Sequence, residues 1–130
     1  MRESAFLARY ILDFALTLAV PGVTTDDIDA LTHDEIIKHN AYPSPLRYSG
    51  FPKSICTSVN EIACHGIPDN RPLIDGDTLK IDISVFLNGY HGDNCATIIV
   101  GDNNPDDQLK LINATIESLD KAISVCGPGV

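Results

Sequence analysis

Basic residues and aromatic residues are scarce in this chain of 130 residues. It has no tryptophan, and nine lysines and arginines stand against eighteen aspartates and glutamates, which gives a formal net charge of -9. Because nucleic-acid phosphates and anionic lipid surfaces are bound through concentrated positive charge, neither is an expected partner. Long apolar runs are missing as well. The most apolar stretch, residues 10–20, contains Asp13 and is too short to cross a bilayer.

The cysteines form no C-x-x-C pair, so neither a zinc knuckle nor a disulfide framework is predicted. We expect free thiols that fill small buried spaces, in a protein of a reducing compartment. The four cysteines are Cys56, Cys64, Cys95 and Cys126. A phosphate-binding loop and a G-x-S-x-G motif are absent. The first residues, MRES, lack the layout of a signal peptide, and Glu3 and Asp13 argue against a transit peptide.

Apolar periodicity predicts two helices in the first third of the chain. The first covers residues 3–20 and is ended by a Pro-Gly pair. The second follows TTDD, which resembles a capping box, and runs to about residue 40. Ile28, Leu31 and Ile36 are the expected inner side of the second helix.

The rest of the chain alternates between turns and regular elements. Residues 42–53 hold three prolines and are predicted to be a loop or an irregular edge, and residues 54–63 hold short strand-like pieces. A last helix is predicted over about 106–126. It ends in PGV, as the first helix does, so either a second structural repeat begins there or the match is common helix punctuation.

The clearest strand signal is the alternation of apolar and polar residues over 79–87. Asn88-Gly89 follows, which is a strong hairpin signal, and residues 90–100 form the returning strand. With a two-residue turn, Asp82 and Asp93 become diagonal neighbours on one face. The same face carries Ser84 and His91, and the core-facing side carries Ile81, Ile83 and Val85.

The paired aspartates admit two interpretations. Diagonal neighbours across a hairpin lie roughly 5–8 Å apart at Cβ. Two carboxylates this close repel each other unless a positive charge lies between them, and a divalent cation satisfies both. The alternative is a hydrated outer sheet face on which both aspartates are solvated.

The histidines also have competing interpretations. His65 lies in CHGIP, in a loop between strand pieces, where functional residues are frequent, although a bystander is the alternative. His91 lies on the carboxylate face, where it would orient a metal ligand. His33 and His39 of the second helix are expected to be solvated. A nucleophilic pair of His65 with a nearby cysteine lacks any orienting third group.

An ordered series of motifs resembles a known family. It runs through YPSPL at 42–46, FPKS at 51–54, CTSVNE at 56–61, CHGIP at 64–68 and NGYHGD at 88–93. The series is similar to that of type I methionine aminopeptidases of the eukaryotic form, including the mitochondrial variety, and it covers essentially the whole chain. The resemblance implies the first half of a pita-bread fold, an α+β architecture with helices packed on an antiparallel sheet.

The resemblance also implies a site. The family removes the initiator methionine with two divalent metal ions, such as cobalt, manganese, iron or zinc, and an activated water. Asp82 matches the aspartate that chelates one ion, and Asp93 matches the aspartate that bridges both. His65 matches the histidine that contacts substrate at the scissile bond. The wall of the pocket for the methionine side chain matches Pro45, Tyr48, Phe51 and Cys56.

Three metal ligands of the family pattern are not matched in this sequence. The family uses a further histidine and two glutamates as ligands, but after Asp93 this sequence has no histidine and a single glutamate, Glu117. We therefore expect residues 1–130 to be the N-terminal half of one catalytic domain, inactive alone, weak in metal binding and prone to aggregation. Implied partners are nascent polypeptide N-termini and the ribosome, in the cytoplasm or the mitochondrion. The alternative is a non-catalytic half-domain that binds a partner chain.

Overall fold

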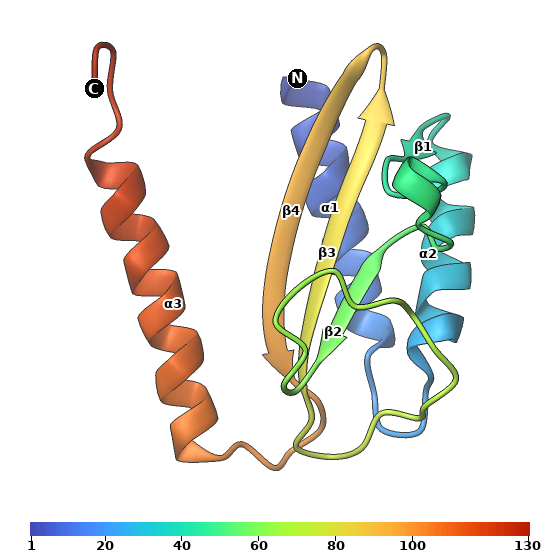
Figure 1. Ribbon diagram of the computed structural model, residues 1–130, viewed down its shortest axis with the longest axis vertical. Coiled ribbons are helices and arrows are strands. Elements are labelled where there is room, and N and C mark those ends of the chain that lie inside the picture. The colour runs from blue at the N-terminus through green and yellow to red at the C-terminus, as the bar shows by residue number, and fades with distance from the viewer.

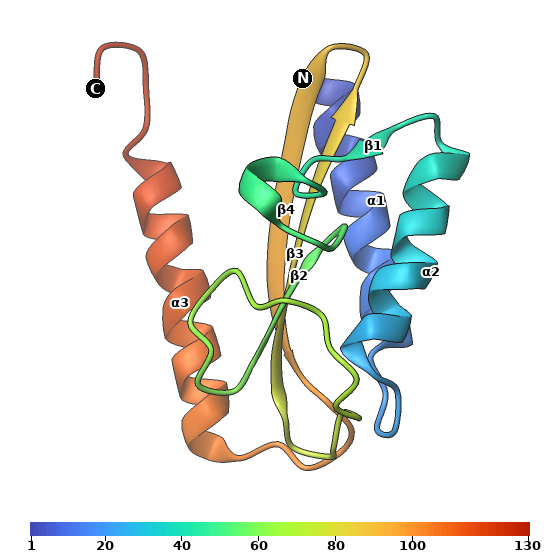
Figure 2. The ribbon, with the colours of Figure 1, turned by 45° about the vertical axis from the view of Figure 1, so that its right-hand side comes forward.

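The computed structural model describes residues 1–130, in which two helices pack on an antiparallel sheet and a third helix stands apart (Figures 1 and 2). The helices are α1 (Arg2–Leu18), α2 (Thr25–Lys38), the short 3-10 helix η1 (Tyr48–Gly50) and α3 (Asp106–Ser124). The strands are β1 (Tyr42–Pro43), β2 (Cys56–Val59), β3 (Thr78–Leu87) and β4 (Tyr90–Ile99). The predicted α+β arrangement of helices on an antiparallel sheet is confirmed.

β3 and β4 form the hairpin that Asn88-Gly89 predicts. Both turn residues have positive φ angles, 51° and 86°, which a two-residue turn of this kind requires. Asp82 pairs with Cys95 and Ser84 pairs with Asp93, so the predicted register is confirmed. β1 and β2 both pair with the other side of β3, which leaves β4 as an edge strand along its ten residues.

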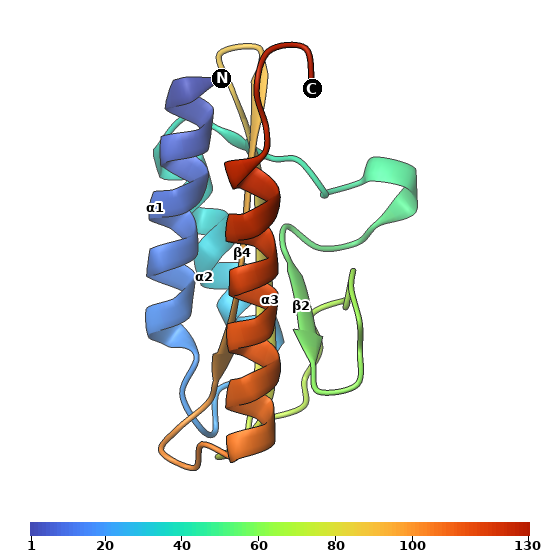
Figure 3. The ribbon, with the colours of Figure 1, turned by 90° about the vertical axis from the view of Figure 1, so that its left-hand side faces the viewer.

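The two faces of the sheet are covered differently. α1 and α2 lie on one face, while the segments around η1 and after β2 lie on the other (Figure 3). The hydrophobic core lies under the helices, and Ile81, Ile83 and Val85 of β3 are each 0% exposed there, as predicted. α1 packs directly against β4 at Gly92, where an added Cβ would lie 2.2 Å from the Ser4 carbonyl. A side chain at Gly92 would therefore push the helix off the sheet.

The second helix differs from prediction in the residues that it buries. Its capping box at Thr24 is present, and Ile28 and Ile36 are fully buried. Leu31, expected on the inner side, is 49% exposed, so that prediction is wrong. The buried side follows an i, i+4 spacing from Ile28 to Ile36, and the position between them is taken by buried Thr32.

The proline-rich stretch at residues 42–53, predicted to be a loop or an irregular edge, contains two short regular elements. Its first two residues form β1, which pairs with Val85 and Phe86 of β3, and three of its later residues form η1. Arg47 and Ser49 adopt positive φ angles of 67° and 48° around η1. Turn residues of this kind break periodicity, which explains why the sequence pattern did not show these elements.

α3 extends from the end of β4 and buries none of its residues. Figures 1 and 2 both show it separated from α1 and α2. A hollow of about 1070 Å³ lies between α3 and the sheet, with Cys95 and Thr97 on the side of β4. The helix exposes apolar side chains at Leu111, Ile116, Leu119 and Ile123. None of the helices has the length and apolar character needed to span a membrane.

The cysteines are all free, as predicted, but only one is buried. Cys56 on β2 is 8% exposed, whereas Cys64, Cys95 and Cys126 are exposed, so the expectation of four buried fillers is wrong for three of them. Cys95 projects from the outer face of the hairpin, and Cys126 follows α3. Cys95 borders the hollow in front of α3, and this hollow leaves its side chain exposed.

Candidate metal and peptide site

All seven candidate site residues line a single cavity of about 710 Å³ on the sheet face opposite α1 and α2. They come from the turn before η1, from η1 and the segment after it, from β2, from the loop after β2, and from the β3–β4 hairpin. The seven residues are Pro45, Tyr48, Phe51, Cys56, His65, Asp82 and Asp93. The structure therefore brings together residues that lie far apart in the sequence.

The two aspartates form the floor of the cavity. Asp82 is half-buried on β3, and Asp93 is exposed on β4, where its carboxylate accepts a hydrogen bond from the Ser84 hydroxyl. Burial is the main cause that raises the pKa of Asp82 to about 6. The negative charge of Asp93 and a hydrogen bond shared with it raise this pKa further, while His65 opposes the rise. The floor therefore favours a proton or another cation between the two carboxyl groups.

The donor chemistry fits one part of a metal site. Carboxylate oxygens suit divalent cations such as manganese and zinc, and a cation here would relieve the repulsion that raises the pKa of Asp82. However, no group of three or more histidine, cysteine, aspartate or glutamate side chains in the structure is arranged to hold an ion. Asp82 and Asp93 therefore supply two ligands and not a complete coordination shell.

His65 is exposed in the loop after β2 and faces the cavity floor. Its backbone has a positive φ of 54°. The next residue, Gly66, fixes the loop on β2, because its carbonyl accepts a hydrogen bond from the Thr57 N–H at 2.9 Å and its N–H donates to the Ser58 hydroxyl at 3.0 Å. An added Cβ on Gly66 would lie 2.1 Å from the Thr57 carbonyl oxygen. This close approach of the Gly66 backbone to β2 fixes where the neighbouring residue, His65, lies relative to the sheet.

The apolar wall is built by the turn around η1 together with β2. The Tyr48 N–H donates to the Pro45 carbonyl at 3.0 Å, which closes the turn, and the Tyr48 ring is 76% exposed. Phe51 is half-buried after η1. Cys56 pairs with Asp82 across β2 and β3. Burial, followed by the charges of the two aspartates, raises the pKa of Cys56 to about 11, so its sulfur is a neutral, apolar surface at neutral pH.

Several lining residues were not among the candidates. Ser44 and Ile67 line the cavity, and the Ser44 hydroxyl lies 2.9 Å from Nδ1 of His91. The His91 ring also packs against Phe86, with ring centroids 4.8 Å apart. Alternation along the hairpin placed His91 on this face, but no sequence pattern gave the position of Ser44. Its place depends on the pairing of β1 with β3.

Comparison with known proteins gives consistent matches. The description of the matching family is Metallopeptidase family M24, and the match covers residues 1–130. The chain is 62% identical over 130 residues to methionine aminopeptidase 1D, chloroplastic/mitochondrial, of Arabidopsis thaliana, which is 100% of this chain and 37% of that relative. It is 51% identical over 129 residues to methionine aminopeptidase 1D, mitochondrial, of Homo sapiens, 99% of this chain and 38% of that relative. The chain thus spans little more than a third of the length of these relatives.

Solved structures agree with the sequence matches. Methionine aminopeptidase from Rickettsia prowazekii superimposes with a TM-score of 0.90 at 44% identity, covering 92% of this chain and 48% of that chain. Methionine aminopeptidase from Thermotoga maritima superimposes with a TM-score of 0.93 at 30% identity, and the match covers 100% of this chain and 52% of that chain. Prolidase from Pyrococcus horikoshii OT3 is 22% identical and superimposes with a TM-score of 0.67. The match covers 92% of this chain and 34% of that chain, and it shows a shared fold alone. These neighbours have pita-bread folds, which confirms the expected fold class and the resemblance seen in the motifs.

Proposed function

The chain belongs to metallopeptidase family M24, and we propose that its cavity is part of the active site of a methionine aminopeptidase, a hydrolase that removes an N-terminal methionine. One observation carries the proposal. The two candidate metal ligands, the candidate catalytic histidine and the candidate apolar wall, which reach the site from separate segments, all line one cavity. The names of the relatives in the comparison support the same substrate class.

Each group has a defined task in this proposal. Asp82 and Asp93 would hold a divalent metal ion, which supplies an activated water for attack on the peptide carbonyl. His65, held by the loop contact at Gly66, donates a hydrogen bond to the substrate at the scissile peptide. The neutral Cys56 sulfur and the rings of Tyr48 and Phe51 bind the methionine thioether, because sulfur packs well against aromatic rings.

Residues 1–130 supply only part of this machinery. Two carboxylates leave a metal ion without the remaining ligands that a catalytic site requires, and no third ligand lies beside them. We therefore propose that the 130 residues alone bind metal weakly and do not turn over substrate. The donors that complete the site would lie in a region corresponding to the part of the relatives that this chain does not cover.

The proposed substrates are the N-termini of nascent polypeptides, and the ribosome is the proposed place of encounter. The relatives from Homo sapiens and Arabidopsis thaliana carry mitochondrial or chloroplastic names, which supports a mitochondrial location for this protein. The excess of acidic residues agrees with a partner other than nucleic acid.

A second candidate function is partner binding without catalysis. The exposed apolar residues of α3 and the unpaired edge of β4 favour it, because such surfaces are usually covered in a soluble protein. Sedimentation of the metal-free protein at micromolar concentration separates the two functions. A stable dimer that forms without metal favours partner binding, whereas a monomer favours the aminopeptidase proposal.

Nuclear magnetic resonance (NMR) provides the direct test of the aminopeptidase proposal. We expect Mn²⁺ to broaden the amide signals of Asp82 and Asp93 first, and L-methionine amide to shift the signals of Phe51, Cys56 and His65. The variant Asp93→Asn is expected to lose the Mn²⁺ effect while keeping the fold. L-alanine amide, which lacks the thioether, serves as the ligand control. Mn²⁺ broadening centred away from the cavity, or equal binding of both amides, would contradict the proposal.

A further inference from the structure

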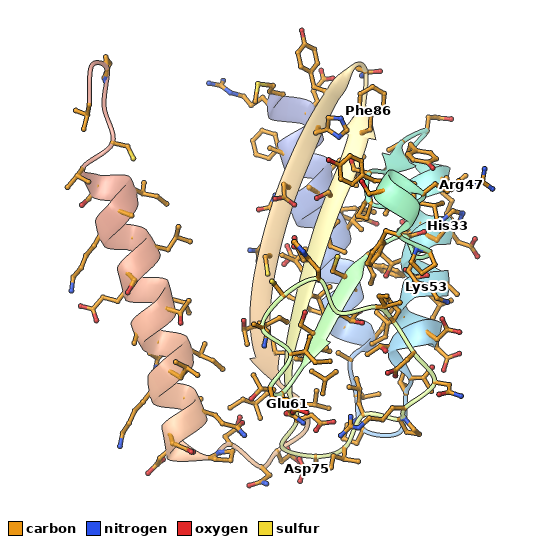
Figure 4. All side chains as sticks on the ribbon, viewed as in Figure 1. His33, Arg47, Lys53, Glu61, Asp75 and Phe86 are labelled. Carbon is orange, nitrogen blue, oxygen red and sulfur yellow. The ribbon has the colours of Figure 1, made fainter.

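Three side chains on one side of α2 hold three consecutive residues of the segment that leads into β2. Asp26, Asp29 and His33 are spaced i, i+3 and i+7, so they lie on one side of the helix. Lys53 forms an ion pair with Asp26, and the two residues after it are bound by Asp29 and His33. Figure 4 shows His33 and Lys53 together at α2. Each of these three residues of the segment is therefore held by at least one side chain of the helix.

The central contact is made by Asp29. Its Oδ1 atom accepts hydrogen bonds from the Ser54 N–H at 2.8 Å and from the Ile55 N–H at 3.0 Å. The Ser54 hydroxyl also lies 2.8 Å from Nδ1 of His33. Asp29 is 7% exposed, Ser54 is 3% exposed and Ile55 is 0% exposed. Because water does not reach these amides, Asp29 is their acceptor in place of solvent.

A buried carboxylate at this place needs an explanation. Burial raises the pKa of Asp29, and the two backbone hydrogen bonds and Lys53 oppose the rise. Burying an apolar side chain at position 29, beside Ile28, would cost less free energy than burying a carboxylate. What Asp29 provides, and an apolar residue does not, is a fixed acceptor for two successive amides.

Those amides lie between two parts of the cavity wall. Phe51 and Pro52 line the cavity just before the segment, and Cys56 lines it just after. Only residues 53–55 connect them. A shift of the Ser54 and Ile55 backbone therefore moves both sides of the apolar wall, although none of residues 53–55 lines the cavity.

We propose that Asp29 is a positioning residue that fixes the separation between Phe51 and Cys56, and thereby the shape of apolar side chain that the cavity accepts. His33 supports it through Ser54. This inference rests on the proposed function, because it assumes that the cavity binds a methionine side chain. It assigns to α2, which does not itself line the cavity, control over what the cavity selects.

The test compares variants of the full chain. Asp29→Leu keeps the number and branching of the side-chain heavy atoms and removes the acceptor, while Asp29→Asn keeps one oxygen for both amides. Thr25→Val is the matched control, since Thr25 is a buried residue of the same helix with two hydrogen bonds to the backbone of Asp69, which is outside the cavity. The readout is the ratio of the dissociation constants of L-methionine amide and L-leucine amide, measured by NMR titration beside the melting temperature.

We expect Asp29→Leu to lower the preference for the methionine amide by about fivefold or more, because a pocket distinguishes aliphatic side chains only through close packing. Asp29→Asn is expected to keep the preference within about twofold, as is Thr25→Val even if its melting temperature falls. A purely structural role would lower the melting temperature of Asp29→Leu and leave the ratio unchanged, and that result would overturn the inference. If Asp29→Leu does not fold, Asp29→Ala replaces it, because it also removes the acceptor of both amides and adds no bulk, and an unchanged ratio in that variant is equally decisive.

The outcome can be separated from failure of the proposed function. If the wild-type chain binds neither amide, the proposed function fails, and the inference is judged on the ligand-free protein. Asp29→Leu must then shift the amide signals of Phe51 and Cys56, while Thr25→Val leaves them in place. Unchanged signals at both residues in Asp29→Leu would overturn the inference.

Discussion

Asp82 and Asp93 project from paired strands into the same cavity and share a hydrogen bond between their carboxyl groups. The hairpin register makes them diagonal neighbours, so their Cβ atoms are held close together on one face of the sheet. Burial and then the charge of Asp93 raise the pKa of Asp82 to about 6, so Asp82 keeps its proton to a higher pH than an ordinary aspartate does. At higher pH, the floor of the site carries two negative charges unless a metal ion replaces the proton.

Replacing Asp82 by asparagine is therefore expected to stabilise the metal-free protein. The pKa of Asp82 is raised from about 3.9 in the unfolded chain to about 6. Ionisation thus disfavours the folded state, with no effect below pH 4 and the full effect above pH 6. We expect Asp82→Asn to raise the free energy of unfolding by about 1–2 kcal/mol at pH 8 and to leave it unchanged at pH 4. Urea denaturation at both pH values, with the exposed Asp34→Asn as control, measures this difference, and a less stable Asp82→Asn at pH 8 would contradict it.

Asp77 behaves in the opposite way. A hydrogen-bonded ion pair with Arg71 is the main cause that lowers the pKa of Asp77 to about 2, helped by bonds from Ile74 and Asn60 and opposed by burial. The carboxylate therefore contributes stability above about pH 4 that is lost as the pH falls to about 2. Because the Arg71 side chain is 44% exposed, we expect Asp77→Asn to cost only about 1–2 kcal/mol at pH 7.

The Asp77 prediction has a pH signature. The wild-type chain should lose this contribution between pH 4 and pH 2, whereas Asp77→Asn should show a flatter profile in that window. Asp13→Asn is the control, since Asp13 pairs with Arg9 in solvent and a surface pair contributes less than about 1 kcal/mol. Parallel pH profiles of wild type and Asp77→Asn would show that the Arg71 pair has no stabilising role.

Gly66→Ala is expected to disturb the loop that carries His65. The added Cβ would meet the backbone of Thr57 at 2.1 Å, and backbone cannot move aside as a flexible side chain does. We expect a loss of about 3 kcal/mol or more, measured by thermal unfolding. Gly127→Ala is the matched control, because its Cβ would meet only a Val130 methyl at 3.9 Å. Equal stability of both variants would mean that the loop is free to shift away from β2.

α3 is expected to exchange its amide hydrogens much faster than β3. None of its residues is buried, so its hydrogen bonds are not supported by tertiary packing, which supplies most of the stability of helices in proteins. We expect protection of α3 to be at least about a hundredfold lower than that of Ile81 and Ile83 at the centre of β3. Hydrogen exchange followed by mass spectrometry measures both. Strong protection of α3 at micromolar concentration would instead indicate that another copy or partner covers it.

The hairpin was the most predictable part of the fold. Asn88-Gly89 fixes a two-residue turn, and the turn fixes every cross-strand pair between β3 and β4. The capping box at Thr24 was equally readable, because its hydrogen bonds are local. Local chemistry therefore predicted the elements whose geometry depends on a few consecutive residues.

Long-range packing decided the features that sequence patterns missed. Leu31 satisfied the helical spacing but faces solvent, and His33, expected to be solvated, is half-buried beside Ser54. His39, in contrast, is exposed as predicted. Periodicity indicates that a helix has an inner side, but the partner that packs on it decides which of two adjacent positions is buried. For α2 that partner includes residues 53–55, which periodicity does not describe.

The candidate site was predicted by two different routes. The pattern of the hairpin alone placed Asp82 and Asp93 together, with a hydrated sheet face as the alternative. Pro45, Tyr48 and Phe51 could be grouped with them only through the family resemblance, because their segment has no periodicity. That they share a cavity depends on β1 pairing with β3, a contact between residues about forty positions apart.

β3 divides the molecule along its length. Ile81 and Ile83 point into the interior, while Asp82 and Ser84 point into the cavity, so neighbouring residues of one strand answer to different selective pressures. Substitutions along β3 are thus expected to alternate in their effect. Those at core-facing positions lower the abundance of the protein, and those at cavity-facing positions change ligand binding. Substitutions at the cavity-facing positions of such a strand can change its chemistry during evolution, while the core-facing positions keep the protein folded.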